Sequence, residues 1–453
     1  MKPAAPSLGS GRTTARQISA LAVPAFGALI AEPLFLLADS AIVGHLGVPQ
    51  LAGVGLAATI LQTVVGLMVF LAYSTTPAVA RLLGAGRHAQ ALAVGRDGLW
   101  LAAILGIALA GCGVFASEAL LRAMGASGQV LVYAQEYLIV SLAGLPAMLL
   151  VLAATGVLRG LQDTKTPLLV ATAGFGVNVV LNFVLVYGLH MSVGGAALGT
   201  VIAQWGMAVV YLIIVVKAAR HQHVPLRPDW RGIQKVSSVG SWLMLRTVSL
   251  RLAILATIIV ATAQGQNNLA AHQLAMTIFT FFAFALDALA IAAQALIGKE
   301  LGAANVAQVR ILTRTMTRWG LCFGVLTGLA LAAFSGKAGW IFTSDQQVHT
   351  VLTVALLVMA VGQPLAGYVF VLDGVLIGAG DGRYLALAGM ANLIFYLPLL
   401  LWVHASDFTD MTVALFWLWA AFSIGYMGAR ALTLGVRART DKWMQVGVSA
   451  SRR

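Results

Sequence analysis

Two carboxylates stand in an otherwise apolar stretch near the start of the chain, EPLFLLADSAIVGHLG at residues 32–47. Glu32 and Asp39 are seven residues apart, about two helical turns, so both can lie on one face of a helix. An acid inside a membrane-spanning helix is costly and usually faces the bundle interior or a cavity. We therefore interpret Asp39 as the group that exchanges a coupling ion, with Glu32 as a second candidate. The alternative is that Asp39 is hydrated near the outer end of its helix and has no such role.

The segment also contains two prolines. Pro24 and Pro33 each remove one backbone hydrogen bond from a helix. A locally loosened helix beside an acid is suited to a gate that responds to ion binding. We expect the helix to bend at Pro24.

Two amides and a hydroxyl in later apolar stretches are the next candidates. Asn178 and Asn182 are four residues apart in GVNVVLNFVLVYG, so they share one helix face. Thr200 follows in GAALGTVIAQ. Amides can bond a carboxylate or line a polar pocket, although buried asparagines also join membrane helices for purely structural reasons.

Charged residues in the second half of the chain suggest a buried ion pair. Arg251 and Asp287 lie at similar depths in consecutive apolar stretches, which predicts that they pair. Arg246 is shallower and can extend to the membrane surface. Asp373, near the end of a later apolar stretch, is a candidate for a second coupling or substrate contact, or for a hydrated residue at a helix end.

These residues must be positioned by membrane helices. Hydrophobic residues make up 60% of the 453 residues and charged residues 9%, against about 25% charged in soluble domains. The composition predicts an all-α polytopic membrane protein, since a helix needs about 20 apolar residues to cross. The twelve expected spans are 17–44, 51–80, 98–117, 130–158, 166–188, 192–216, 238–262, 269–298, 319–335, 347–378, 384–403 and 410–436.

The net charge of +13 is explained by topology. Nearly all of the 28 Lys and Arg residues fall on the side of the membrane that carries both termini, whereas Arg122 and Lys337 fall on the other. By the positive-inside rule both termini are cytoplasmic. The basic charge therefore does not indicate a nucleic-acid partner.

The chain repeats itself at an offset of 218 residues. LAGVGLAATI (51–60) and LAAHQLAMTI (269–278) share six of ten residues, and GVLRGLQD (156–163) matches GVLIGAGD (374–381). The repeat predicts two six-helix bundles, residues 1–216 and 238–453, joined by a cytoplasmic linker at 217–237. Six helices give both bundles the same orientation, with an axis along the membrane normal. Two such bundles are typical of transporters, and no filter-like loop favours a channel.

The segments LFLLADSAIVGHLG, LRGLQDTKTP and NVVLNFVLVYGLHMSVGGAALGTVIAQ resemble the multidrug and toxic compound extrusion (MATE) transporters. ALDALAIAAQALIGKELGA (285–303), with Arg246 upstream, resembles the DinF branch of that family. The resemblance implies an antiporter that expels lipophilic, often cationic compounds in exchange for H⁺ or Na⁺. It also implies an ion site at Asp39, Asn178, Asn182 and Thr200. Some members have Asp at the position of Asn182. The absence of this second carboxylate weakens a Na⁺ site and favours H⁺ as the coupling ion.

We therefore predict a secondary antiporter of the plasma membrane that acts as a monomer within the lipid bilayer on a small amphipathic substrate. We expect no enzymatic activity, no cofactor apart from the coupling ion, and no metal other than a possible Na⁺ at Asp39. The alternative is a flippase for a lipid-linked precursor from the same wider superfamily. Such a flippase needs a cationic cleft, for which the sequence offers only Arg246 and Arg251.

Overall fold

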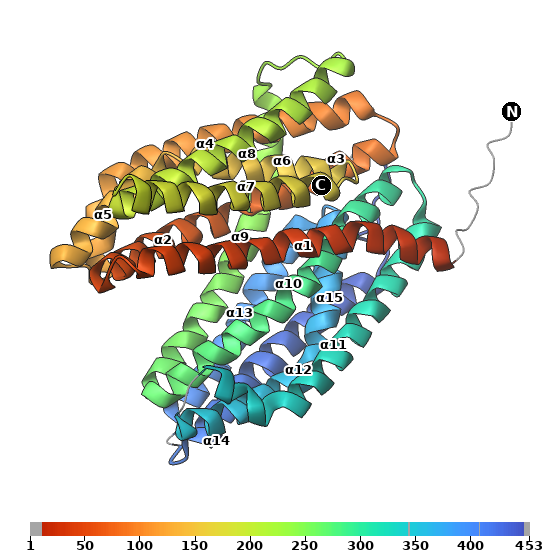
Figure 1. Ribbon diagram of the computed structural model, residues 1–453. Coiled ribbons are helices and arrows are strands. Elements are labelled where there is room, and N and C mark those ends of the chain that lie inside the picture. Colours follow the sequence, from red (N-terminus) through yellow and green to blue (C-terminus); the bar gives the residue numbers. More distant parts are fainter. Residues whose placement is uncertain (1–10, 343–344, 407, 448–453) are drawn as a thin grey trace, which may run out of the picture. The chain divides into compact units, whose positions relative to one another are not determined.

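The computed structural model describes residues 11–342, 345–406 and 408–447, and within these ranges it contains helices and no strands (Figure 1). The all-α prediction is therefore confirmed. Eleven helices, or helix pairs that run on as one, are long and apolar enough to cross a membrane. A further pair of helices, Gly128–Leu142 and Leu145–Gly160, is bent by 50° at the break between them. This pair forms the twelfth span if it is counted as one. This agrees with the twelve spans expected from the sequence.

Contacts divide the chain into two compact units, described here separately. The N-terminal unit is Val23–Ser241, and the C-terminal unit runs from Trp242 onward together with α1 up to Ala22. The first group of elements is α1 (Gly11–Gly44), α2 (Val48–Met68), α3 (Phe70–Gly84), α4 (His88–Ala123), α5 (Gly128–Leu142), α6 (Leu145–Gly160), α7 (Lys165–Phe183), the π-helix η1 (Val184–Gly188) and α8 (Ser192–His221). The second group is α9 (Trp230–Ala263), α10 (Gln266–Gly302), α11 (Val306–Phe342), α12 (Gln346–Gly378), α13 (Gly382–Ala405), α14 (Met411–Ala420), the π-helix η2 (Ala421–Tyr426) and α15 (Met427–Arg439).

The connection between α8 and α9 is shorter than the linker expected at 217–237, because both helices extend into that range. Only residues 222–229 lie between them, and they pack on the N-terminal unit. Val224 joins a small apolar cluster with Leu92 of α4. Arg96 of α4 donates to the carbonyl of Pro225 (2.7 Å). An apolar side chain and a backbone carbonyl therefore hold this segment against α4.

The 218-residue repeat is visible in how the helices touch. A Cβ placed on Gly156 would lie 2.8 Å from the Cα of Ala72, and one on Gly374 would lie 2.7 Å from the Cα of Ala290. These two contacts join α6 to α3 and α12 to α10, and all four positions correspond at the offset. In each unit, glycine lets two backbones approach more closely than any side chain would permit.

The turns that follow these helices are repeated as well. Gln162 and Gly380 both have positive φ, at 68° and 76°. The next residues, Asp163 and Asp381, each donate their N–H to a carbonyl five residues earlier, at 2.9 and 3.0 Å. This is the left-handed helix ending that closes many α-helices, and it occurs at the same place in both copies.

Replacing Gly156 or Gly374 with alanine should destabilise the protein, because the new methyl group would meet backbone atoms that have no room to move. Overpacking of this kind costs about 1–3 kcal/mol. Thermal unfolding of the purified protein in detergent should show a lower midpoint for each variant. Gly176→Ala is the matched control, since nothing lies within 4 Å of a Cβ there. Equal midpoints for all three variants would contradict the close packing.

Candidate functional site

Asp39 lies in α1, and its side chain is buried. Its Oδ1 accepts a hydrogen bond from Nδ2 of Asn182 on α7 (2.6 Å). The same amino group donates to Oδ1 of Asn178, one turn earlier on α7 (3.0 Å). The structure thus brings together the acid and both amides that the sequence singled out.

The chain of hydrogen bonds continues onto α8. Nδ2 of Asn178 donates to Oγ1 of Thr200 (3.0 Å), whose hydroxyl donates to the carbonyl of Ala196 (3.0 Å). The amino group of Asn182 thus donates in two directions, to Asp39 and, through Asn178 and Thr200, toward the carbonyl of Ala196. Asp39 is the acceptor at one end of this linked polar chain.

Local packing explains why this chain can form between α7 and α8. A Cβ on Gly199 would overlap Oδ1 of Asn182, so the glycine admits the amide against α8. The helix also changes character just beyond Asn182, where η1 begins at Val184. π-Helical turns inside α-helices frequently mark functional sites. In η1, the Tyr187 hydroxyl donates to the carbonyl of Ile42 (2.6 Å), which ties this region to α1.

Tyr137 is a site residue that sequence reasoning missed. Its side chain on α5 is buried, and its hydroxyl interacts with Asp39 and Thr200. A tyrosine in an apolar span is usually a core or lipid-facing residue, so the residue type alone did not indicate a site. The available signal was Ser141, one turn further along the same helix.

Two predictions about α1 remain open. The side chain of Glu32 lies outside the side chains that the structure describes. Pro24 and Pro33 both lie inside one continuous helix. The boundary between the two units falls between Ala22 and Val23, one residue before Pro24. The bend at Pro24 stays a prediction.

The C-terminal unit contains a buried charged cluster centred on Asp373 of α12. Arg246 of α9 donates from Nε to Oδ1 of Asp373 (3.0 Å) and from Nη2 to Oδ2. Arg430 of α15 lies 3.7 Å from Oδ1 and is also buried. Asp287 of α10 interacts electrostatically with Arg430. Two arginines and two carboxylates therefore gather in this unit.

This cluster differs from the predicted pairing of Arg251 with Asp287, because the ion pairs that the structure shows join Arg246 and Arg430 to Asp373. The pairing of Arg251 with Asp287 stays a prediction. Arg246 and Arg251 are five residues apart, about 140° around the helix axis, so only one can face the bundle interior. Arg246 is the buried one, and Arg251 is exposed. Arg430 was missed because α15 ends in several basic residues and Arg430 was grouped with that cytoplasmic charge.

The C-terminal unit has no acid at the position that corresponds to Asp39. Thr257 occupies that position, and its hydroxyl shares a hydrogen bond with Tyr396, which corresponds to Asn178 (2.7 Å between the oxygens). Among the described residues, no group of three or more His, Cys, Asp or Glu side chains is placed to hold a metal ion.

Comparisons with known proteins agree with this architecture. The sequence model of the MatE family matches residues 24–184 and 244–402. The DNA damage-inducible protein F of Escherichia coli is 32% identical over 405 residues, which cover 86% of this chain and 88% of that protein. The probable multidrug resistance protein NorM of Thermotoga maritima is 23% identical, over 81% of this chain and 80% of that protein. A crystal structure of the Vibrio cholerae MATE transporter VcmN in the bent form has a TM-score of 0.86 at 22% identity, and covers 96% of this chain and 99% of that one.

Neutralising Asp373 should destabilise the protein because it removes the charged acceptor of two hydrogen bonds from the buried Arg246. Breaking a buried pair in this way costs about 3–5 kcal/mol. Asp373→Asn should therefore lower the unfolding midpoint strongly, and Arg246→Gln combined with Asp373→Asn should recover part of the loss. Arg251→Gln is the control and should have little effect, since its side chain is exposed. A larger loss from Arg251→Gln than from Asp373→Asn would contradict the assignment.

Proposed function

The chain belongs to the MATE family of multi-pass membrane transporters, and from this premise we propose that it is a secondary antiporter. It exports small amphipathic compounds in exchange for a proton that binds at Asp39. Homologues that carry the name multidrug resistance protein support the substrate class. We place it in the plasma membrane as a monomer with both termini in the cytoplasm.

One observation carries the proposal, namely that the buried carboxylate of Asp39 forms no ion pair among the described residues. The groups that contact its carboxylate are the amide of Asn182 and the phenol of Tyr137. An ionised carboxylate in a low-dielectric interior is costly without a cation. Binding of a cation from outside is therefore favourable at this position, and exchange of that cation between the two sides of the membrane is ion coupling.

The orientation of Asn182 favours a proton over Na⁺. Its amino group contacts two acceptors, on Asp39 and Asn178, so a reversed amide would set its oxygen against two other oxygens. Na⁺ prefers oxygen ligands. To bind between Asp39 and Asn182 it would have to turn the amide and break both hydrogen bonds. A proton on Asp39 requires no such rearrangement.

The second candidate, a lipid-precursor flippase, is favoured by the two buried arginines near Asp373. A cationic cleft for an anionic headgroup needs an excess of positive charge. Arg246 and Arg430 are balanced by Asp373 and Asp287. The antiporter is therefore the better explanation of the site.

Asp39→Asn should abolish efflux driven by a pH gradient and leave the protein folded, because an amide has the same shape but cannot exchange a proton. The measurement is dye efflux from proteoliposomes with an imposed pH gradient, alongside a thermal unfolding curve. Glu118→Gln is the matched control, since it removes an acid from an exposed ion pair with Arg122 that contributes at most about 1 kcal/mol. Wild-type efflux by Asp39→Asn would refute coupling at this residue.

Asn182→Asp should confer a response to Na⁺, because it places a second carboxylate beside that of Asp39. The new carboxylate supplies a further charged oxygen ligand, which the native amide cannot provide. Efflux driven by a Na⁺ gradient alone should be absent in the wild type and appear in the variant. Asn392→Asp is the control, because this buried asparagine bonds Thr433 in the C-terminal unit. Na⁺-driven efflux by the wild-type protein would overturn the preference for a proton.

A further inference from the structure

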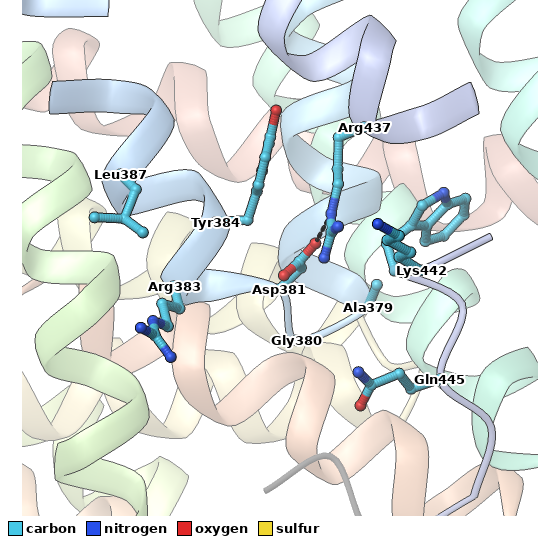
Figure 2. A pocket seen from close by; sticks show the side chains of 10 residues that line it. Ala379, Gly380, Asp381, Arg383, Tyr384, Leu387, Arg437, Lys442 and Gln445 are labelled. Carbon is cyan, nitrogen blue, oxygen red and sulfur yellow. Dashed lines mark hydrogen bonds and ion pairs between the residues drawn. The ribbon is translucent and has the colours of Figure 1, made fainter. Parts of the chain in front are cut away.

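A cavity of about 360 Å³ lies in the C-terminal unit, at the turn between α12 and α13 (Figure 2). The tail after α15 forms its other wall, with Lys442, Trp443 and Gln445. This end of the unit belongs to the side that the positive-inside rule assigns to the cytoplasm. Nothing in the coupling proposal involves these residues, so the cavity is a separate feature.

The charges that line the cavity favour an anion. Arg383, Arg437 and Lys442 are opposed by one acid, Asp381. Asp381 accepts a hydrogen bond from Nε of Arg437 (2.6 Å), and the Arg437 guanidinium lies 4.8 Å from the ring centre of Tyr384. Figure 2 shows Tyr384 and Lys442 on opposite sides of Arg437. Arg437 is thus fixed and neutralised. Arg383 and Lys442 are exposed, and the Arg383 guanidinium lies 5.8 Å from the ring centre of Trp242.

Backbone donors at the cavity add to this preference. Helix α13 begins at Gly382, and no side chain caps it, since the carboxylate of Asp381 is engaged by Arg437. The first N–H groups of a helix have no partner within that helix, and they favour an anion at its N-terminus.

The tail is held in place by contacts with other helices of its unit. Asp441 pairs with Arg310 of α11 (3.1 Å), and the N–H of Gly447 donates to the carbonyl of Leu301 on α10 (3.2 Å). Trp443 is buried. These contacts fix the tail wall before any ligand binds.

We propose that this cavity binds a phosphate-bearing anion, specifically the headgroup of an anionic phospholipid from the cytoplasmic leaflet. An apolar stripe leads away from it along α13. Leu387 lines the cavity, and Ile394 and Leu401 follow at seven-residue intervals on the same face, with exposed fractions of 53%, 65% and 65%. A phospholipid matches both parts, with its phosphate among the basic side chains and an acyl chain along the stripe. A soluble phosphate compound would use only the cavity.

The proposal can be tested by native mass spectrometry of the full-length protein with dioleoyl phosphatidylglycerol or dioleoyl phosphatidylcholine. The site variant combines Arg383→Gln with Lys442→Gln. The control variant combines Arg314→Gln with Arg318→Gln, which removes the same charge from exposed positions of α11. Thermal unfolding with either lipid or with inorganic phosphate reports folding and binding together.

We expect the wild type and the control to retain phosphatidylglycerol in preference to phosphatidylcholine. In the site variant, binding should weaken on the order of tenfold, because two basic contacts are lost. If inorganic phosphate stabilises the wild type but not the site variant, and phosphatidylglycerol stabilises neither, the ligand is a soluble phosphate compound. That result would overturn the phospholipid as the ligand of the cavity. Equal lipid loss in the site and control variants, or no loss in either, would overturn the site itself.

Discussion

The hydrogen bond from Asn182 to Asp39 is the contact on which the N-terminal unit depends. It offsets part of the free-energy cost of burying a carboxylate inside a membrane helix. That bond requires α7 to lie close to α8, which Gly199 permits. It also requires α1 to stay beside the end of α7, which the bond from Tyr187 to Ile42 enforces. The polar chain that reaches Thr200 then orients the amide. The close packing at Gly199, the contact between η1 and α1, and the polar chain therefore all position the hydrogen bond to the buried Asp39 carboxylate.

The duplicated scaffold and the unduplicated chemistry follow different rules. Gly156 and Gly374 are kept in corresponding contacts, because a methyl group would push two helices apart in either copy. No such constraint acts on the polar position, where Asp39 in one copy is replaced by Thr257 in the other. The hydroxyls of Thr257 and Tyr396 satisfy each other without any charge. A duplication of this kind preserves the contacts between backbones and leaves side chains free to specialise.

The sequence could predict whatever depends on regular spacing. Hydropathy gave the spans, the offset of 218 gave the two copies, and the four-residue spacing of Asn178 and Asn182 put both amides on the face that meets Asp39. Spacing along one helix cannot say which side of that helix faces its own bundle. The sequence therefore did not show that Arg246, rather than Arg251, is the buried arginine of α9 and that it binds Asp373. Nor can it bring distant segments together. Tyr137 and Arg430 reach their clusters from α5 and α15, which carry no sequence link to those sites.

The difference in charge between the two units bears on where coupling takes place. Asp373 was a candidate for a second coupling acid, but its carboxylate is held by Arg246 and lies near Arg430. Protonating it would leave two buried arginines with less negative charge around them, which is strongly unfavourable in a low-dielectric interior. Protonating Asp39 instead removes a buried charge that is not part of any ion pair among the described residues. We therefore infer that the proton is exchanged in the N-terminal unit and that the charged cluster of the C-terminal unit holds its helices together throughout the cycle.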